Sequence, residues 1–255
     1  MRFLLPVIAI LSAVAAAAPG AKAERAWVET APDGATLVLA DGRTLVLDGL
    51  LAPAPADDGA APEADRAAAT ATAALLAAIG GREAAFAPLL PAPDRWGRIP
   101  ADVARPADGA WLQGLMLAEG HARLEACPRG DDARIRRLRA AEAVAREARL
   151  GLWALAVYRP RRADRPMRPA GFQVVEGLAL ATGGGGMMRY LNFDKDWRKD
   201  FTLRAERRFA ARLEALGLGF ESLVGRKVRA RGWLNYRNGP MLHISCARQV
   251  EAISE

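Results

Sequence analysis

The sequence predicts a mainly β protein with helices, an α+β fold in which two small barrels follow one another along the chain. Three observations support this prediction. A strand, turn and strand pattern occupies residues 27–52, three helical patterns follow it, and five strand patterns with one helix fill residues 171–255. With 255 residues, 51% of them hydrophobic and 25% charged, the chain has an ordinary globular composition and the length of one large or two small domains.

The first 23 residues have the pattern of a secretory signal peptide. Arg2 precedes an apolar run over residues 3–18, and the triplet Ala21-Lys22-Ala23 has the small-x-small form of a cleavage site. We therefore expect a mature chain that starts near Glu24 and is secreted or periplasmic. An uncleaved anchor is the alternative, although the run is short and alanine-rich for a bilayer span. No later segment is apolar over the length that a membrane span needs.

The first predicted barrel, within residues 24–154, opens on a β-hairpin. In TLVLADGRTLVL, residues 36–47, two β-rich runs flank Asp41-Gly42, which is a strong hairpin signal. Short strands are also predicted over residues 82–90 and 97–104. Both runs of the hairpin should pair in one sheet with them.

Three helices are predicted in the same part of the chain. The first spans residues 63–81 and ends at Gly80-Gly81, a natural stop signal. The second is predicted over residues 109–125 and the third over residues 131–150. The third has apolar residues at helical spacing and arginines on its remaining faces. These apolar residues are Ile135, Leu138, Ala141, Ala145 and Ala148.

A basic, proline-rich segment divides the chain. Residues 158–169, YRPRRADRPMRP, hold three prolines and five arginines, so they cannot form a regular helix or a central strand. We therefore predict a linker over residues 155–170 and a second domain over residues 171–255. Its strand patterns are followed by a helix after the third strand, at residues 207–217. This is the element order of a small Greek-key barrel of the OB type.

Positive charge is concentrated in the second half of the sequence. The net charge is +7 for the whole chain, −4 for residues 24–154 and +5 for residues 171–255. Attraction to a polyanion is therefore expected in the second half. On the strand predicted over residues 226–236, alternation places three cations and an aromatic ring on one face, a combination suited to single-stranded nucleic acid. The alternative is a solvated edge strand whose charges protect it from aggregation. The residues of this face are Lys227, Arg229, Arg231 and Trp233.

The chain has two cysteines, Cys127 and Cys246, one in each half. An oxidising compartment would permit a disulfide between them, which would link the two halves. The sequence leaves this pairing open against two buried thiols, because it does not show whether the two residues approach each other.

Four motifs in the first half occur together in a known order. They are DGATLVLADGRTLVLDGLLAP (33–53), DRWGRI (94–99), LMLAEGHARLE (115–125) and LRAAEAVAREARLGLWA (138–154). In order and spacing they resemble the thermonuclease family, whose members are micrococcal-nuclease-like OB barrels with three helices. The resemblance covers residues 27–154. Residues 171–255 are similar to a second barrel that follows such domains in some exported family members.

The resemblance implies a phosphodiesterase site in which most of the chemistry is replaced. Active members cleave DNA and RNA with a calcium ion held by carboxylates, a glutamate that activates water and two arginines that neutralise the phosphate. Aspartates belong at the positions of Ala35 and Leu51, an arginine at Val46 and the glutamate at Ala54. The second arginine is retained as Arg98.

We therefore expect a catalytically degenerate homologue, a pseudoenzyme that serves as a binding or scaffold module without a metal or other cofactor. Its expected partner is single-stranded nucleic acid or an envelope protein. The alternative is an active calcium-dependent nuclease whose carboxylates have moved. The carboxylates near the site in sequence are Asp33, Asp48, Asp57, Asp58 and Glu63.

Two further side chains are candidates for nucleic-acid contacts in the first half. Arg98 would reach a phosphate and Trp96 would stack on a base, whereas the expectation without a ligand is a surface role for Arg98 and burial of Trp96 against the barrel. In the second half, the four glycines at residues 183–186 lack the Lys-Ser/Thr of a phosphate-binding loop, and they predict a hairpin turn.

Overall fold

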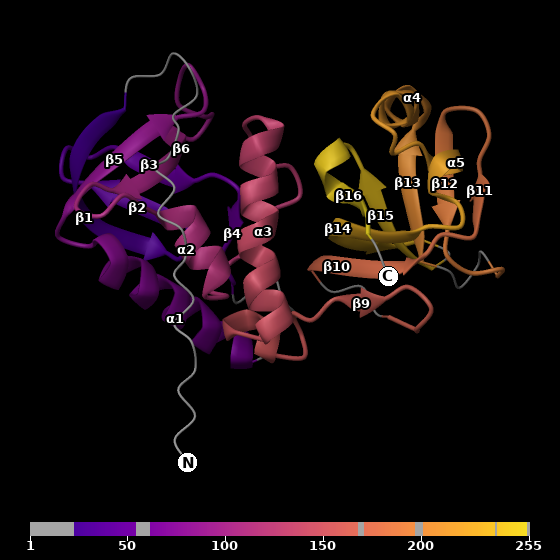
Figure 1. Ribbon diagram of the computed structural model, residues 1–255, viewed down its shortest axis with the longest axis horizontal. Coiled ribbons are helices and arrows are strands. Elements are labelled where there is room, and N and C mark those ends of the chain that lie inside the picture. Colours follow the sequence, from indigo (N-terminus) through magenta and orange to yellow (C-terminus); the bar gives the residue numbers. More distant parts are fainter. Residues whose placement is uncertain (1–22, 55–61, 168–170, 197–200, 238, 254–255) are drawn as a thin grey trace.

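The computed structural model describes residues 23–54, 62–167, 171–196, 201–237 and 239–253 (Figure 1). Most of the predicted signal peptide, and both Asp57 and Asp58, lie outside these residues. Within them, no helix combines the length and the apolar character that crossing a membrane requires.

The first half is built on a closed barrel of five strands. The strands are β1 (Glu24–Asp33), β2 (Thr36–Leu39), β3 (Thr44–Leu47), β5 (Glu83–Pro88) and β6 (Arg98–Arg105), with the short β7 (Ala110–Trp111) beyond β6. They pair in the order β3-β2-β1-β5-β6, and a parallel pairing of β3 with β6 closes the ring. The predicted hairpin is confirmed as β2 and β3, with Gly42 at a φ of 85° in the turn.

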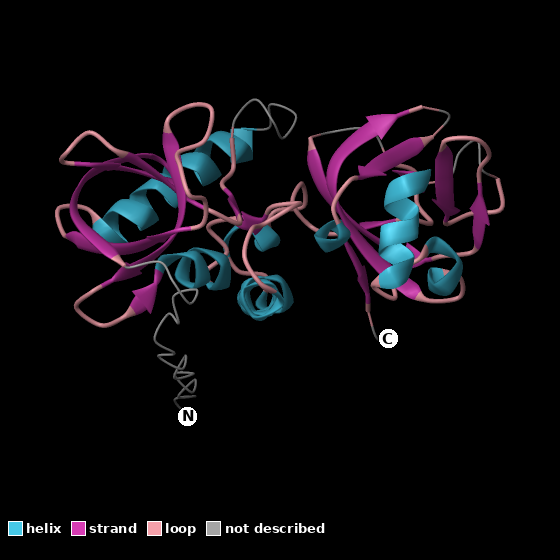
Figure 2. Cartoon of the chain, turned by 90° about the horizontal axis from the view of Figure 1, so that it is seen from above, coloured by secondary structure: helices cyan, strands magenta, loops and turns pink. Residues whose placement is uncertain are grey.

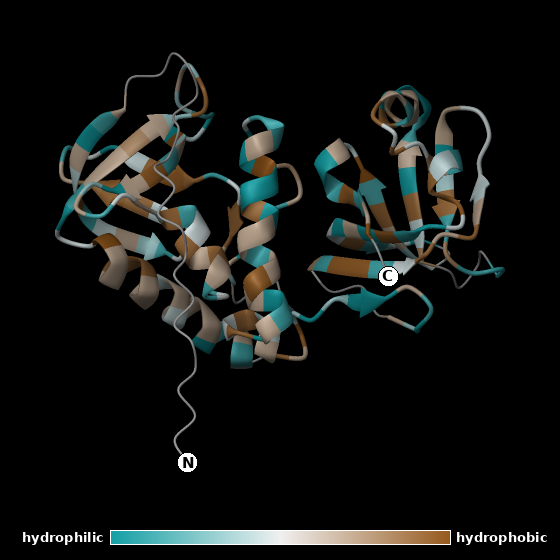
Figure 3. Ribbon diagram, viewed as in Figure 1, coloured by the Kyte–Doolittle hydropathy of each residue, from teal (hydrophilic) through white to brown (hydrophobic). Residues whose placement is uncertain are grey.

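Strand alternation fills this barrel. Leu37, Leu39, Leu45 and Leu47 are fully buried, while the residues between them are partly exposed. Three helices pack around the barrel: α1 (Pro62–Ile79), α2 (Leu112–Ala118) and α3 (Asp132–Ala148). Figure 3 shows hydrophobic residues along the strands and an alternation of hydrophilic and hydrophobic residues along α3.

The second helix is shorter than predicted. Residues 109–125 contain only the seven residues of α2, followed by turns and the short strand β8 (Arg123–Leu124), which pairs with β4 (Leu50–Leu51). The helix ends at Gly120, which has a φ of +74°. A Cβ at this residue would stand 2.4 Å from the carbonyl oxygen of Leu150. The backbone N–H groups of Gly120 and His121 donate to the carbonyl oxygens of Leu117 and Met116 (3.1 and 2.8 Å), so a glycine C-cap ends α2, and the chain after α3 packs closely against it.

The second half is a curled, barrel-like sheet with its own core. Its main strands are β10 (Phe172–Leu178), β11 (Ala181–Gly183), β12 (Met188–Asn192), β13 (Thr202–Glu206), β14 (Lys227–Tyr236) and β15 (Pro240–Ile244), with the shorter β9 (Arg161–Arg162) and β16 (Val250–Ala252). The order is β11-β12-β13-β15-β14-β10-β9, and β16 pairs with β14. Helices α4 (Arg207–Ala215) and α5 (Phe220–Leu223) follow β13. The first strand pattern of this half thus forms two strands, β10 and β11, rather than one.

The two halves lie side by side, with α3 between the first barrel and the second sheet (Figures 1 and 2). Each has a separate large hydrophobic core, and a small cluster of Ala145, Trp153 and Val174 joins them. Part of the predicted linker packs against the protein: Tyr158 is buried, and β9 pairs with β10. We call the contact between the two halves the joint. On the side of the first half it consists of α3 and residues 123–130, and on the side of the second half it consists of β10, β14 and residues 246–251.

Candidate functional site

Neighbouring strands of the barrel carry three of the positions to which the resemblance assigns the chemistry of the site. Ala35 lies in the turn from β1 to β2, and its carbonyl accepts a hydrogen bond from the backbone N–H of Leu47 (2.8 Å). Val46 on β3 lies opposite Thr36 on β2. Arg98 begins β6 and pairs with Thr44, two residues before Val46. Ala35 therefore lies beside the C-terminal end of β3, near Val46, whereas Arg98 lies beside the N-terminal end of the same strand.

The loop after β4 approaches the same turn. A Cβ built on Gly34 would stand 3.4 Å from the Cβ of Ala52 and 2.6 Å from that of Ala71 on α1. The turn therefore needs glycine, because any side chain would push α1 away. Leu51 and Ala54 are partly buried at either end of this loop. The side chains at which the resemblance implies carboxylates, Ala35, Leu51 and Ala54, are thus methyl or isobutyl groups, which offer no oxygen to a cation.

Arg98 is held by its own strand-to-strand turn. Its Nε and Nη2 donate to Oδ2 of Asp94 (3.0 and 2.9 Å), whose Oδ1 accepts the backbone N–H groups of Trp96 and Arg98. Partial burial opposes ionisation of Asp94, but these hydrogen bonds lower its pKa overall. The guanidinium also lies 4.7 Å above the Trp96 ring. Arg98 therefore starts in an ion pair that a phosphate would have to compete with.

Trp96 is exposed, so the prediction that it is buried against the barrel is wrong. Its relative exposure is 62%, because the turn projects the ring outward, where the guanidinium of Arg95 stacks over it at 3.9 Å. Arg95, Trp96 and Arg98 together form an exposed cationic and aromatic cluster, which we call the turn cluster. Such a surface suits base stacking and phosphate contact.

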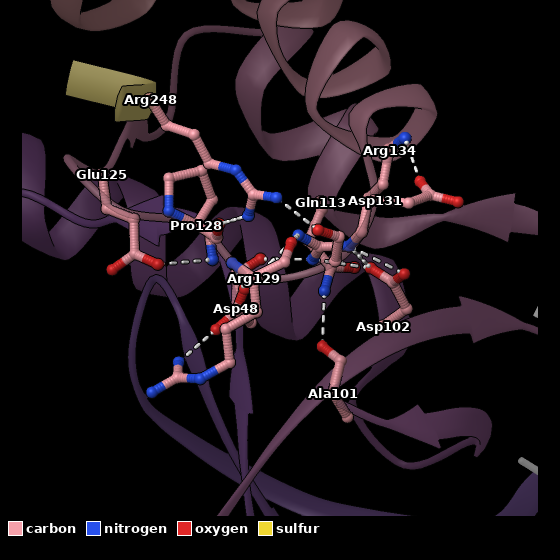
Figure 4. A network of polar contacts seen from close by, with 12 residues as sticks. Asp48, Ala101, Asp102, Gln113, Glu125, Pro128, Arg129, Asp131, Arg134 and Arg248 are labelled. Carbon is pink, nitrogen blue, oxygen red and sulfur yellow. Dashed lines mark hydrogen bonds and ion pairs between the residues drawn. The ribbon is translucent and has the colours of Figure 1, made fainter. Parts of the chain in front are cut away.

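The carboxylate nearest the loop, Asp48, is part of a buried network (Figure 4). It is 2% exposed. Its Oδ1 accepts the backbone N–H of Arg129 (2.8 Å) and Nη1 of Arg134 (3.3 Å), and its Oδ2 accepts the Arg129 guanidinium. The Nε of Arg134 also donates to Asp102 (2.9 Å). Two arginines therefore neutralise Asp48, and its oxygens are occupied by structural hydrogen bonds.

Asp33 and Glu63, the other candidate carboxylates that the structure describes, do not supply a metal site either. Oδ1 of Asp33 accepts the backbone N–H of Ala35 (2.7 Å), and Glu63 is exposed in the first turn of α1. In the part of the chain that the structure describes, no three His, Cys, Asp or Glu side chains come together as metal ligands.

Glu125 is a partly buried acid that no sequence pattern identified. It accepts the backbone N–H of Gly49 (3.2 Å), directly beside the Asp48 network (Figure 4). Burial and the negative charge of Asp48 raise the pKa of Glu125 to about 7. The family motif carries this residue only as the last letter of LMLAEGHARLE, and its environment depends on a contact with a glycine 76 residues earlier in the chain.

The basic face predicted on β14 is mostly turned into the joint. Arg231 is 1% exposed, with its guanidinium against Glu142 on α3 (3.0 Å) and Glu251 (3.0 Å). Arg229 pairs with Glu176 (2.7 Å). The alternation was predicted correctly. The prediction that this face offers three cations to a ligand is wrong, because the first half covers Arg231 and β10 supplies a partner to Arg229. Lys227 and Trp233 remain exposed.

Three more arginines cross the joint. Arg123 donates to the carbonyl oxygen of Phe172 (2.8 Å), Arg139 to that of Arg248 (3.0 Å), and Arg248 to those of Pro128 and Gly130. Their partners are 49 to 120 residues away in sequence. No local pattern could identify them.

The two cysteines meet at the joint as free thiols. Oε1 of Gln249 accepts from the thiol of Cys127 (4.0 Å) and from the backbone N–H of Cys246 (3.0 Å). A hydrogen bond between the two sulfur groups raises the pKa of Cys127 and lowers that of Cys246 to about 6. Cys127 is exposed, so the alternative of two buried thiols is wrong for this residue. The disulfide stays a prediction.

Comparison with known proteins supports the resemblance of the first half. Residues 61–155 match the family model of the staphylococcal nuclease homologues, whereas no curated protein matches the chain. The match includes Arg98 and all three helices of the first half, and it begins after the loop that holds Ala35, Val46, Leu51 and Ala54. Together, the match, the closed five-stranded barrel and its three helices show that the first half of this chain is similar to the staphylococcal nuclease homologues.

Proposed function

We propose that this protein is a catalytically degenerate staphylococcal nuclease homologue that binds single-stranded nucleic acid without cutting it, in an extracytoplasmic compartment. One observation supports the proposal: Ala35, Val46, Leu51 and Ala54, the residues at which the resemblance implies the catalytic groups, are aliphatic and lie on the strands and turns of the closed barrel.

Hydrolysis is disfavoured by the chemistry of these residues. Calcium takes six to eight oxygen ligands, and the retained frame offers aliphatic groups in their place. Loss of a single transition-state donor typically costs about 100- to 1000-fold in rate, and groups that act as a unit fail together. Asp48 cannot substitute, because Arg129 and Arg134 hold both of its oxygens.

Binding is favoured by the surface that remains. The turn cluster presents an exposed indole ring with two guanidinium groups beside it. The net charge of +5 over residues 171–255 adds a long-range attraction to a polyanion. A stacked base is worth roughly 1–3 kcal/mol and is tolerant of sequence, so the proposed ligand is a single strand without a fixed sequence.

The test is fluorescence anisotropy of a labelled oligothymidylate titrated with the purified protein at several salt concentrations. We expect binding that weakens linearly with the logarithm of the salt concentration. Trp96→Ala should weaken it about 5-fold or more. The matched control is Trp27→Ala, which removes an indole of similar exposure (56%) from β1 and should leave the affinity unchanged.

Two results would contradict this proposal. Equal losses in Trp96→Ala and Trp27→Ala would remove the turn cluster as a contact. Absence of any salt-dependent binding would exclude the nucleic-acid ligand and leave an envelope protein as the partner to test.

A further inference from the structure

A cavity of about 630 Å³ lies on the second sheet, far in sequence from the family's site. Cross-strand pairs place its lining on one face: Gly183 lies opposite Tyr190, Tyr190 opposite Arg204, and Asn192 opposite Thr202. The intervening residues Leu191, Leu203 and Leu242 are fully buried in the core of the second half. The cavity therefore opens on the outer face of the sheet formed by β11, β12, β13 and β15.

The described lining of the cavity is positively charged. Among the described residues that line it, Arg204 and Arg237 are cationic and none is a carboxylate. Within the described residues, the Nε of Arg204 is buried and has no hydrogen-bond acceptor. The Nε of Arg231 in the joint is also without an acceptor, but the other nitrogens of Arg231 are paired with Glu142 and Glu251, and Arg98 is paired with Asp94. A buried donor without an acceptor is unfavourable, and an anionic ligand would satisfy that of Arg204 through charge-assisted hydrogen bonds.

The glycine hairpin opens space above the aromatic ring of the cavity. Gly183, opposite Tyr190, leaves that position without a side chain. Gly184 has a φ of +124°, and a Cβ there would stand 2.5 Å from the carbonyl oxygen of Met188, so only glycine fits this turn. The ring of Tyr190 is thereby left with room beside it, and Met188 and Met241 supply further apolar surface.

We propose that this cavity binds one nucleotide unit. Arg204 and Arg237 bind its phosphate, the base packs against Tyr190 between the two methionines, and the side-chain amide of Asn192 donates to the base edge. Guanidinium forks match phosphate oxygens, an aromatic ring stacks on any base, and a volume of 300–1,000 Å³ is usual for small-molecule sites. This inference rests on the proposed function, according to which the bound nucleotide is part of a single strand. A free mononucleotide offers the same phosphate and base.

The experiment uses the intact protein and two probes, labelled oligothymidylate and thymidine monophosphate as competitor. Arg237→Met and Arg204→Met should each weaken binding of the strand about 10-fold and lower the salt slope by about one. Tyr190→Leu should weaken it about 5-fold or more. The matched control, Arg208→Met, removes an exposed arginine of α4 outside the cavity and should change affinity less than 2-fold. Arg237 is exposed, so its variant tests the cavity even if Arg204→Met fails to fold.

The outcomes separate this inference from the proposed function. Strand binding that is unchanged in Arg237→Met and Tyr190→Leu would overturn the cavity while leaving the function intact. Binding of the monophosphate alone, lost in Arg237→Met, would support the cavity and contradict the single-strand function. Binding of neither probe would overturn both.

Discussion

The loop at the end of the first barrel and the joint differ in where they hold ionisable side chains. At the loop, the positions of the family's chemistry hold Ala35, Val46, Leu51 and Ala54. At the joint, Glu142 and Arg231 are 0% and 1% exposed and ion-paired with each other. The described part of the loop thus holds aliphatic side chains at these positions, whereas the surface that contacts the second half is charged and buried. The difference shows that the first half uses buried ionisable side chains to contact the second half.

A buried ion pair is a costly way to join two surfaces. Apolar residues of the same volume are often equally or more stabilising. An ion pair, however, fixes one orientation, because Arg231 must face both Glu142 and Glu251 at once. We infer that the joint sets the relative placement of the turn cluster and the second sheet.

The largest effect is expected from breaking the ion pair of the joint. Glu142→Ala leaves the guanidinium of Arg231 buried with one carboxylate fewer, and it also removes the acceptor of the Leu124 N–H. We expect a loss of about 3–5 kcal/mol in the free energy of unfolding, measured by urea denaturation. The double variant Glu142→Leu, Arg231→Met should recover most of the loss. A loss below about 1 kcal/mol in the single variant would show that the joint does not depend on this pair.

A covalent link at the joint is expected to add about 2–4 kcal/mol. The pKa of Cys246 is low, about 6, so its thiolate attacks oxidised glutathione and releases one reduced glutathione. The deprotonated sulfur of Cys127 then attacks the Cys246 sulfur of this mixed disulfide and releases the second reduced glutathione. The first step should accelerate as the pH rises through 6 rather than through the usual value near 8.5. Mapping of non-reduced peptides and thiol titration should show both thiols consumed. A stable mixed disulfide on Cys246 would contradict the pairing, and Cys127→Ser is the control that can form only that species.

The pH dependence of stability provides a third test, at the boundary between the two regions. Glu125 has a pKa of about 7 in the folded protein and about 4.3 when unfolded, so the folded state binds more protons between these values. The free energy of unfolding should therefore fall as the pH rises from about 4.3 to 7, by about 1.4 kcal/mol per unit at most. Glu125→Gln keeps an acceptor for the Gly49 N–H and should remove this slope, with higher stability at pH 8. An identical slope in the variant would assign the dependence to other groups.

The smallest effect is expected at the retained arginine of the family's site. The pair of Arg98 and Asp94 is partly exposed, with side-chain exposures of 40% and 13%. Exposed pairs contribute about 0–1 kcal/mol. Arg98→Ala should therefore cost less than about 1 kcal/mol by urea denaturation, far less than Glu142→Ala. Equal losses in the two variants would remove the contrast between the loop and the joint.

Local patterns predicted the elements whose causes are local. The hairpin depends on Asp41-Gly42, and α3 begins at an N-cap in which Asp131 accepts the N–H of Arg134 (2.8 Å). The alternation on β14 was equally visible in the sequence. The burial of Arg231 was not, because its partner Glu142 lies 89 residues earlier in the chain. The predicted helix over residues 109–125 stops early at a local signal that the prediction did not use, the glycine C-cap at Gly120.

The candidate sites divide in the same way. Ala35, Val46, Leu51 and Ala54 could be located from the resemblance, since the motif fixes their positions along the chain. The cavity of the second sheet could not, because it depends on which residues of β11, β12 and β13 lie opposite one another. The four glycines were predicted as a hairpin turn, and the space that they leave above Tyr190 becomes visible only when the strands are paired.

The central claim is that the family's frame is retained without its hydrolytic chemistry. The most direct measurement is incubation of the protein with end-labelled single-stranded DNA and calcium, with and without a chelator, followed by electrophoresis of the strand. The account predicts that the strand stays intact in both samples under conditions in which anisotropy shows it bound. Cleavage that the chelator stops and that Arg98→Ala abolishes would contradict it.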